Sequence, residues 1–121
     1  MAGQNEIVDL SFCFAVRIVK LANYLKKEKR EFTLSEQLLR AGTSIGANIT
    51  EAQDAQSRKD FISKLSISLK EAKETRYWLR LLIETHYLPN GTDNMRTLQN
   101  ELDSIIRLLT AIIKSAKSKS V

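Results

Sequence analysis

The sequence contains few residues that break regular structure or supply special chemistry. Its 121 residues include one proline, one histidine, one cysteine and four glycines. Because the proline stands at position 89, long stretches without a helix breaker remain, which favours an all-α protein. The single cysteine, Cys13, excludes an internal disulfide and suits a reducing cytoplasm. We expect its thiol to be a small buried core residue, and a reactive thiol is the alternative interpretation.

Long apolar runs are also missing. No segment reaches the roughly 20 consecutive apolar residues that a membrane-spanning helix needs. The apolar segment that begins at Ile7 is broken by Asp9, Arg17 and Lys20, so we expect no secretion signal. These absences predict a cytoplasmic protein that does not contact a membrane.

Metal binding and catalysis lack the residues that they need. Di-metal helical bundles use a Glu-x-x-His pair on each of two helices. Here His86 is the only histidine, and Glu84 stands two residues before it, on a different helix face. No third residue is placed to orient Cys13 and His86 for nucleophilic catalysis. We therefore expect no metal site, no cofactor and no catalytic residue, and we expect that the protein is not an enzyme.

Apolar residues recur at helical spacing in four segments of the chain. The predicted helices span residues 7–29, 35–55, 58–87 and 93–117. Turn and capping signals separate them, with Ser57 before the third helix and Thr92 or Asp93 before the fourth. Long helices joined by short connections pack as antiparallel neighbours. The sequence therefore predicts a single all-α domain over residues 1–121, an up-down-up-down four-helix bundle.

Small residues dominate the stretch RAGTSIGANITEAQ, from Arg40 to Gln53. Gly42 and Gly46 lie four residues apart, so they share one face of the helix. Two glycines inside a helix cost roughly 2 kcal/mol relative to alanine, a cost that close approach of another backbone would offset. Asn48 and Glu51 lie beside the apolar seam, where a polar pair could link two helices. This stretch therefore predicts a tightly packed inner helix.

Two arginines, Arg40 and Arg76, interrupt largely apolar stretches. A charge that is removed from water is costly unless an opposite charge pairs with it. Glu51 and Glu71 are the expected partners, which predicts an ion-pair network between helices or subunits. The alternative is that the two arginines line a pore or groove for an anionic ligand.

Two longer runs carry a family resemblance. The runs LLRAGTSIGANITEA (Leu38 to Ala52) and FISKLSISLKEAKETRYWLRLL (Phe61 to Leu82) resemble the small four-helix-bundle proteins first noticed in intervening sequences of bacterial 23S rRNA genes. This resemblance covers nearly the whole chain. It implies a four-helix protomer that assembles into a ring-like homopentamer. The family is also similar to the accessory protein of diversity-generating retroelements, which is basic and works with nucleic acid and a reverse transcriptase.

Positive charge is concentrated in three segments, although the formal net charge is only +5. Residues 17–31, 58–80 and 107–121 each carry an excess of four positive charges. The first two segments provide the candidate nucleic-acid-binding residues, Lys26, Lys27, Lys29 and Arg30 with Lys70, Lys73, Arg76 and Arg80. Because the first and third helices end at the same pole of an antiparallel bundle, we expect these residues to form one continuous basic flank. The alternative is that the lysines only solvate the surface and complement helix dipoles.

The first and third helices carry more apolar surface than one bundle core requires, which predicts a homo-oligomer. The candidate interface residues are Phe12, Phe61, Tyr77 and Trp78, and Tyr77 is expected to be the more exposed of the adjacent pair. Tyr77 and Trp78 could instead stack on nucleic-acid bases, since basic residues surround them. Two hypotheses follow: an oligomer that binds RNA, DNA or a protein acting on them, and an interaction scaffold that binds no nucleic acid.

Overall fold

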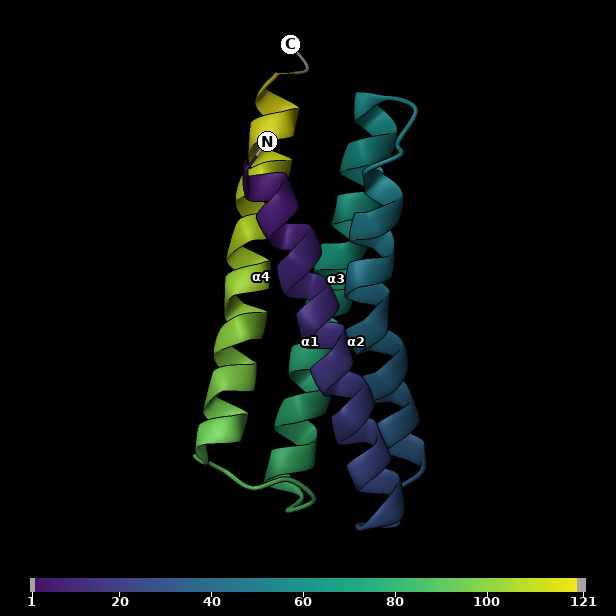
Figure 1. Ribbon diagram of the computed structural model, residues 1–121, viewed down its shortest axis with the longest axis vertical. Coiled ribbons are helices and arrows are strands. Elements are labelled where there is room, and N and C mark those ends of the chain that lie inside the picture. Colours follow the sequence, from purple (N-terminus) through teal and green to yellow (C-terminus); the bar gives the residue numbers. More distant parts are fainter. Residues whose placement is uncertain (1, 120–121) are drawn as a thin grey trace.

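The computed structural model describes the backbone of residues 2–119 and the side chains of residues 6–119. Within these residues the chain forms helices and no strand. The helices are α1 (Ala2–Lys27), α2 (Thr33–Ala52), α3 (Arg58–Glu84) and α4 (Asp93–Ser118). They run alternately up and down, as Figure 1 shows. The expected all-α four-helix architecture is therefore confirmed.

Each helix packs against two neighbours and avoids the helix diagonal to it. α1 contacts α2 and α4, and α3 contacts the same two helices. α1 and α3 therefore occupy opposite corners of the bundle, and in Figure 1 α1 crosses in front of α3 near the middle of the view. α2 is buried along one face between α1 and α3, and its contacts with these two helices are the most extensive in the bundle. This arrangement decides which side chains share a surface.

Several helix ends depart from the expected positions by two to five residues, and α1 spans Ala2–Lys27 in place of the expected 7–29. α2 begins at Thr33 because the Glu31 carboxylate accepts a hydrogen bond from the Ser35 backbone N–H at 2.8 Å. α3 stops at Glu84, since His86 adopts a left-handed backbone with φ of 67°. The N–H of Tyr87 then donates to the Leu82 carbonyl, which closes a Schellman turn. α2 also ends early, at Ala52.

The predicted caps of α3 and α4 are present. The Ser57 hydroxyl accepts a hydrogen bond from the Asp60 N–H at 3.0 Å. The Thr92 hydroxyl accepts one from the Met95 N–H at 3.3 Å. Each bond satisfies a backbone donor that the first turn of a helix leaves free. The sequence signals thus locate both helix starts correctly.

Both glycines of α2 face α1, as the sequence predicted. A Cβ atom on Gly42 would lie 2.7 Å from Cγ2 and 2.9 Å from Cγ1 of the buried Ile18. A Cβ on Gly46 would lie 3.4 Å from the backbone oxygen of Ser11. Small residues therefore allow α1 and α2 to approach closely. Gly42 leaves no room for a Cβ atom, because the Ile18 side chain fills the space, whereas Gly46 leaves room for one.

The core is a single cluster of buried aliphatic side chains with one phenylalanine, Phe14. Cys13 lies outside it, and the expectation of a buried thiol is wrong because this position of α1 points to the surface. Over the described residues, no helix is long and apolar enough to cross a membrane.

Candidate nucleic-acid interface

One stripe of α3 is exposed along most of the length of the helix, and its positions hold only cations, serines and a tyrosine, with the exposed Ile67 beside it. Its members recur at alternating steps of four and three residues, so they form one stripe. All of them are exposed, whereas Leu65, Ala72 and Leu79 on the opposite side are buried. We name this stripe the α3 basic face, and its members are Lys59, Ser63, Ser66, Lys70, Lys73, Tyr77 and Arg80.

The positive charge of the α3 basic face is not neutralised within the described part of the chain. Lys59, Lys70, Lys73 and Arg80 form no salt bridge there. The stripe contains no acidic residue until Glu84, at the end of the helix. Cations without internal partners are available to an external anion, and this is the electrostatic pattern that phosphate binding requires.

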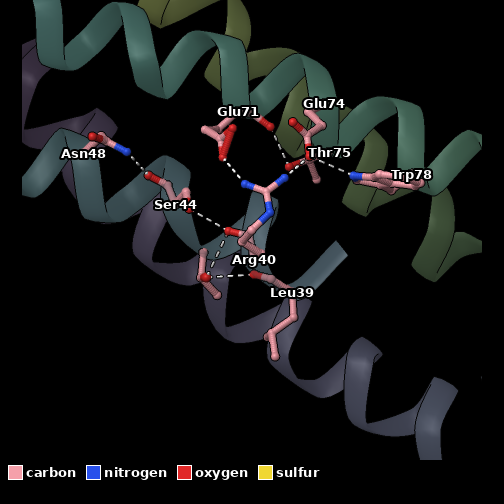
Figure 2. A network of polar contacts seen from close by, with 9 residues as sticks. Leu39, Arg40, Ser44, Asn48, Glu71, Glu74, Thr75 and Trp78 are labelled. Atoms are coloured by element: carbon pink, nitrogen blue, oxygen red, sulfur yellow. Dashed lines mark hydrogen bonds and ion pairs between the residues drawn. The ribbon is translucent and has the colours of Figure 1, made fainter. Parts of the chain in front are cut away.

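The acids in the middle of α3 are held on the side that faces α2. Arg40 of α2 donates to the Glu71 carboxylate at 2.8 Å and also to that of Glu74 (Figure 2). Glu71 is 8% exposed, so its pairing with Arg40 matters for the packed bundle. The predicted Arg40–Glu71 contact is confirmed. By holding both carboxylates, Arg40 keeps negative charge away from the α3 basic face.

Other predicted polar contacts are wrong. Arg76 pairs with neither Glu51 nor Glu71 but contacts Asp103 of α4 at 3.0 Å. Arg76 lies on the flank of α3 that faces α4, whereas the two glutamates belong to the α2–α3 side. Asn48 does not link two helices, since its side chain donates to the Ser44 carbonyl of the same helix at 2.8 Å.

Glu51 does link two helices, through a residue that the sequence did not single out. Lys64 of α3 contacts its carboxylate at 2.9 Å. The hydrogen bond to Glu51, followed by the negative charge of that carboxylate, raises the pKa of Lys64 above its ordinary value of 10.5. Lys64 therefore takes part in the α2–α3 contact and is not part of the α3 basic face.

The basic end of α1 lies apart from the α3 basic face. Lys27, Lys29 and Arg30 are exposed, and we name them the α1 basic end. Lys26 is not included in this group, because its charge is already paired with Glu36 of α2. The expected continuous flank is wrong, because α1 and α3 are diagonal and their outer faces point in opposite directions. The segment after α1 and the last turn of α3 approach each other at one pole, where Lys29 and Glu84 line one surface pocket.

The four candidate interface aromatics fall into two groups. Phe12 and Tyr77 are exposed at 69% and 57%. Phe61 and Trp78 are half-buried and pack against the core, so their rings already stabilise the protomer. The expectation that Tyr77 is more exposed than Trp78 is confirmed. Phe12 continues along α1 into the exposed residues Val16 and Val19, and we name these three residues the α1 apolar stripe.

Sequence reasoning missed Lys59, Ser63 and Ser66 as members of the α3 basic face. The signal was present, since these residues continue the same steps of four and three that place Lys70, Lys73, Tyr77 and Arg80 together. Apolar periodicity does not reveal this stripe, because its members are cations, serines and one tyrosine. Arg76 was included for its charge, although it stands one position outside the stripe.

Comparisons with known proteins agree with this architecture. The model of the 23S rRNA-intervening sequence protein family matches residues 3–111. A crystal structure from Bacteroides thetaiotaomicron, of a protein with unknown function from the S23 ribosomal protein family, is similar at 53% sequence identity and a TM-score of 0.88. The similarity covers 93% of this chain and 98% of that one. No protein with a curated description matches. The chain belongs to the 23S rRNA-intervening sequence protein family.

Proposed function

We propose that this protein is a non-enzymatic, cytoplasmic homo-oligomer that binds RNA or DNA through the phosphates of the strand. The observation that carries the proposal is the α3 basic face, where Lys59, Lys70, Lys73 and Arg80 have no internal ion pair within the described residues. Membership of a family named for intervening sequences of 23S rRNA is in keeping with such a ligand.

The geometry suits a ligand with repeated negative charges. A helix rises about 1.5 Å per residue, so the stretch from Lys59 to Arg80 extends about 30 Å. The serines between the cations add hydroxyl groups that bind phosphate oxygens. Such contacts position a strand without reading its bases, and we expect weak sequence specificity.

The salt dependence follows from the number of cations. If all four cations of the α3 basic face contact phosphates, affinity falls roughly 50- to 150-fold between about 50 and 200 mM salt. A second basic element, the α1 basic end, lies on the opposite side of the protomer. It offers a separate site of attachment and does not extend the first one.

Self-association would repeat these surfaces. The α1 apolar stripe exposes Phe12, Val16 and Val19 to solvent, at 69%, 39% and 41%. Covering such a patch with a second copy would remove apolar area from water. The family resemblance suggests a ring-like homopentamer. Several weak phosphate sites on one rigid assembly would then act together through their effective concentration.

The test compares three charge-reversed variants by fluorescence anisotropy with labelled RNA and DNA. The variant K70E/K73E/R80E changes the α3 basic face, and K27E/K29E/R30E changes the α1 basic end. The control R107E/K114E/K117E makes the same charge change on α4. We expect the first variant to lose most of its affinity and the control to lose little. Equal losses in all three would attribute binding to net charge alone, and no binding by the wild type at micromolar concentration would refute the proposal.

The α1 apolar stripe favours a second candidate function, a homo-oligomeric scaffold that binds a protein partner without nucleic acid. Phe12 is the most exposed large apolar residue among the described side chains, and its exposure has no role in phosphate binding. Light scattering of the wild type and of F12S/V16S tests the oligomer that both candidates share, and the nucleic-acid binding assay separates the two candidates. We expect the double variant to be a monomer, and a wild type that is already monomeric would remove the oligomer from both candidates.

A further inference from the structure

Tyr77 is the only aromatic member of the α3 basic face, and it lies between cations. Lys73 precedes it by one helical turn and Arg80 follows it by one turn, on the same stripe. Its side chain is 57% exposed. The ring offers an apolar face to a flat ligand, and the two flanking cations form no ion pair within the described residues.

The ring of Tyr77 is supported by its neighbour. The rings of Tyr77 and Trp78 meet edge to face, with centroids 5.0 Å apart and planes inclined by 73°. Such a contact is a favourable aromatic geometry. It reduces the freedom of the exposed ring, so a ligand that stacks on the ring would lose less conformational entropy on binding.

Trp78 is itself fixed by the polar network of α2 and α3. Its indole Nε1–H donates to the Glu74 carboxylate at 3.0 Å, as Figure 2 shows. That same carboxylate accepts a hydrogen bond from Arg40, which also contacts Glu71. A chain of contacts therefore runs from α2 through Arg40, Glu74 and Trp78 to Tyr77. The network thus supports an aromatic ring at the surface as well as joining two helices.

We propose that Tyr77 is a stacking platform for an unpaired base, so that the α3 basic face prefers single-stranded nucleic acid to a duplex. This inference rests on the proposed phosphate-binding function of the same face. A base in a duplex is covered on both sides by its neighbours, whereas an unpaired base exposes a flat surface that stacks on an aromatic ring. Lys73 and Arg80 would hold the phosphates on either side of the stacked base.

The first test measures affinity for three probes of 20 nucleotides: oligouridine, oligothymidine and a mixed-sequence duplex. We expect Tyr77→Ala to weaken binding to both single strands by about 5- to 150-fold, with a much smaller loss on the duplex. Tyr77→Phe keeps the ring and should keep the preference. The matched control is Ile67→Ala, which removes an exposed apolar side chain from α3 outside the α3 basic face and should change neither affinity.

The outcomes separate this inference from the proposed function. If wild-type protein binds duplex and single strand and Tyr77→Ala weakens both equally or neither, the platform is refuted while phosphate binding stands. If the wild type binds no probe, the proposed function fails and the platform fails with it. If Tyr77→Ala changes the molar mass in light scattering, Tyr77 is a contact with a second copy of the chain, and the inference is overturned.

The positioning role of Glu74 has its own test. Glu74→Leu removes the acceptor for the Trp78 indole, and Glu74→Gln restores one. We expect Glu74→Leu to reduce the preference for single strands and Glu74→Gln to recover it. Because Trp78 is the only tryptophan, its fluorescence reports on the site directly. It should change on binding single strands in the wild type and much less in Tyr77→Ala, and an unchanged preference in Glu74→Leu would refute the supporting role.

Discussion

The two glycines of α2 should respond in opposite directions to the addition of a single methyl group. In Gly42→Ala the new Cβ would lie 2.7 Å from Cγ2 and 2.9 Å from Cγ1 of Ile18. Carbon atoms pack at about 3.5–4.0 Å, so something must move by about 1 Å. Ile18 is fully buried and β-branched, and its Cβ, which no change of rotamer moves, would itself lie 3.2 Å from the new atom.

The magnitude follows from two opposing terms. Overpacking a core costs about 1–3 kcal/mol, and the three close atoms of Ile18 place this site near the upper end. Replacing a helical glycine by alanine recovers about 1 kcal/mol. We therefore expect Gly42→Ala to lower the free energy of unfolding by about 2 kcal/mol, which corresponds to a fall in Tm of about 8 °C.

Gly46 provides the matched control on the same helix face. A Cβ there meets Ser11 at 3.4 Å, which is an ordinary contact. The higher helix propensity of alanine is then not offset by overpacking, so Gly46→Ala should raise the free energy of unfolding by up to about 1 kcal/mol. Gly46→Leu should lower it by about 1–3 kcal/mol, because the larger side chain would press on the backbone of α1.

A double-mutant cycle identifies the cause. Ile18→Ala removes both γ carbons, so in that background Gly42→Ala should stabilise by about 1 kcal/mol. The assay is thermal or urea denaturation followed by circular dichroism, at one protein concentration because oligomers melt in a concentration-dependent way. If Gly42→Ala has the same effect in both backgrounds, the Ile18 contact is not the cause of the destabilisation.

Three further predictions concern stability. Arg40→Met should lower the free energy of unfolding by about 1–2 kcal/mol, because Glu71 loses its partner. Adding Glu71→Met should restore most of that stability in urea denaturation, and a double variant as unstable as Arg40→Met would contradict the prediction. His86→Gly should raise the free energy of unfolding by about 1 kcal/mol, because His86 has a positive φ that glycine adopts without strain. The pKa of Lys64 is raised by its pairing with Glu51, so the pair should make the wild type more stable than Lys64→Met. This difference in unfolding free energy should be fully present below pH 10.5 and should shrink as the pH rises through the folded-state pKa of Lys64. A difference that stays constant in thermal melts at alkaline pH would contradict the pairing.

The four helices and their inward faces could be predicted from local pattern. Apolar spacing identified the buried side of each helix, and Ser57 and Thr92 located two helix starts. The glycine pair predicted a close helix contact, which Ile18 and Ser11 of α1 provide. These features depend on the few residues within one or two turns, so the sequence alone contains the necessary information.

The partners of flanking residues could not be predicted in the same way. A side chain on the edge of a helical face has a neighbouring helix on one side only, and periodicity does not say which one. For this reason Arg76 was assigned to the glutamates of the α2–α3 side, although it contacts Asp103 of α4. The chemistry of a lone cysteine favours the core, but the position of Cys13 on α1 points to solvent.

The sequence by itself determined the number of helices, their buried faces and the concentration of positive charge in three segments. Only the tertiary structure decided how that charge is distributed over surfaces. α1 and α3 share a pole but occupy opposite corners, so their basic residues form two separate surfaces. Arg40 holds Glu71 and Glu74 toward α2, which leaves the outer stripe of α3 without acids as far as Glu84. The physical reason is that charge along a chain is local, whereas the face on which it acts depends on which helices are neighbours.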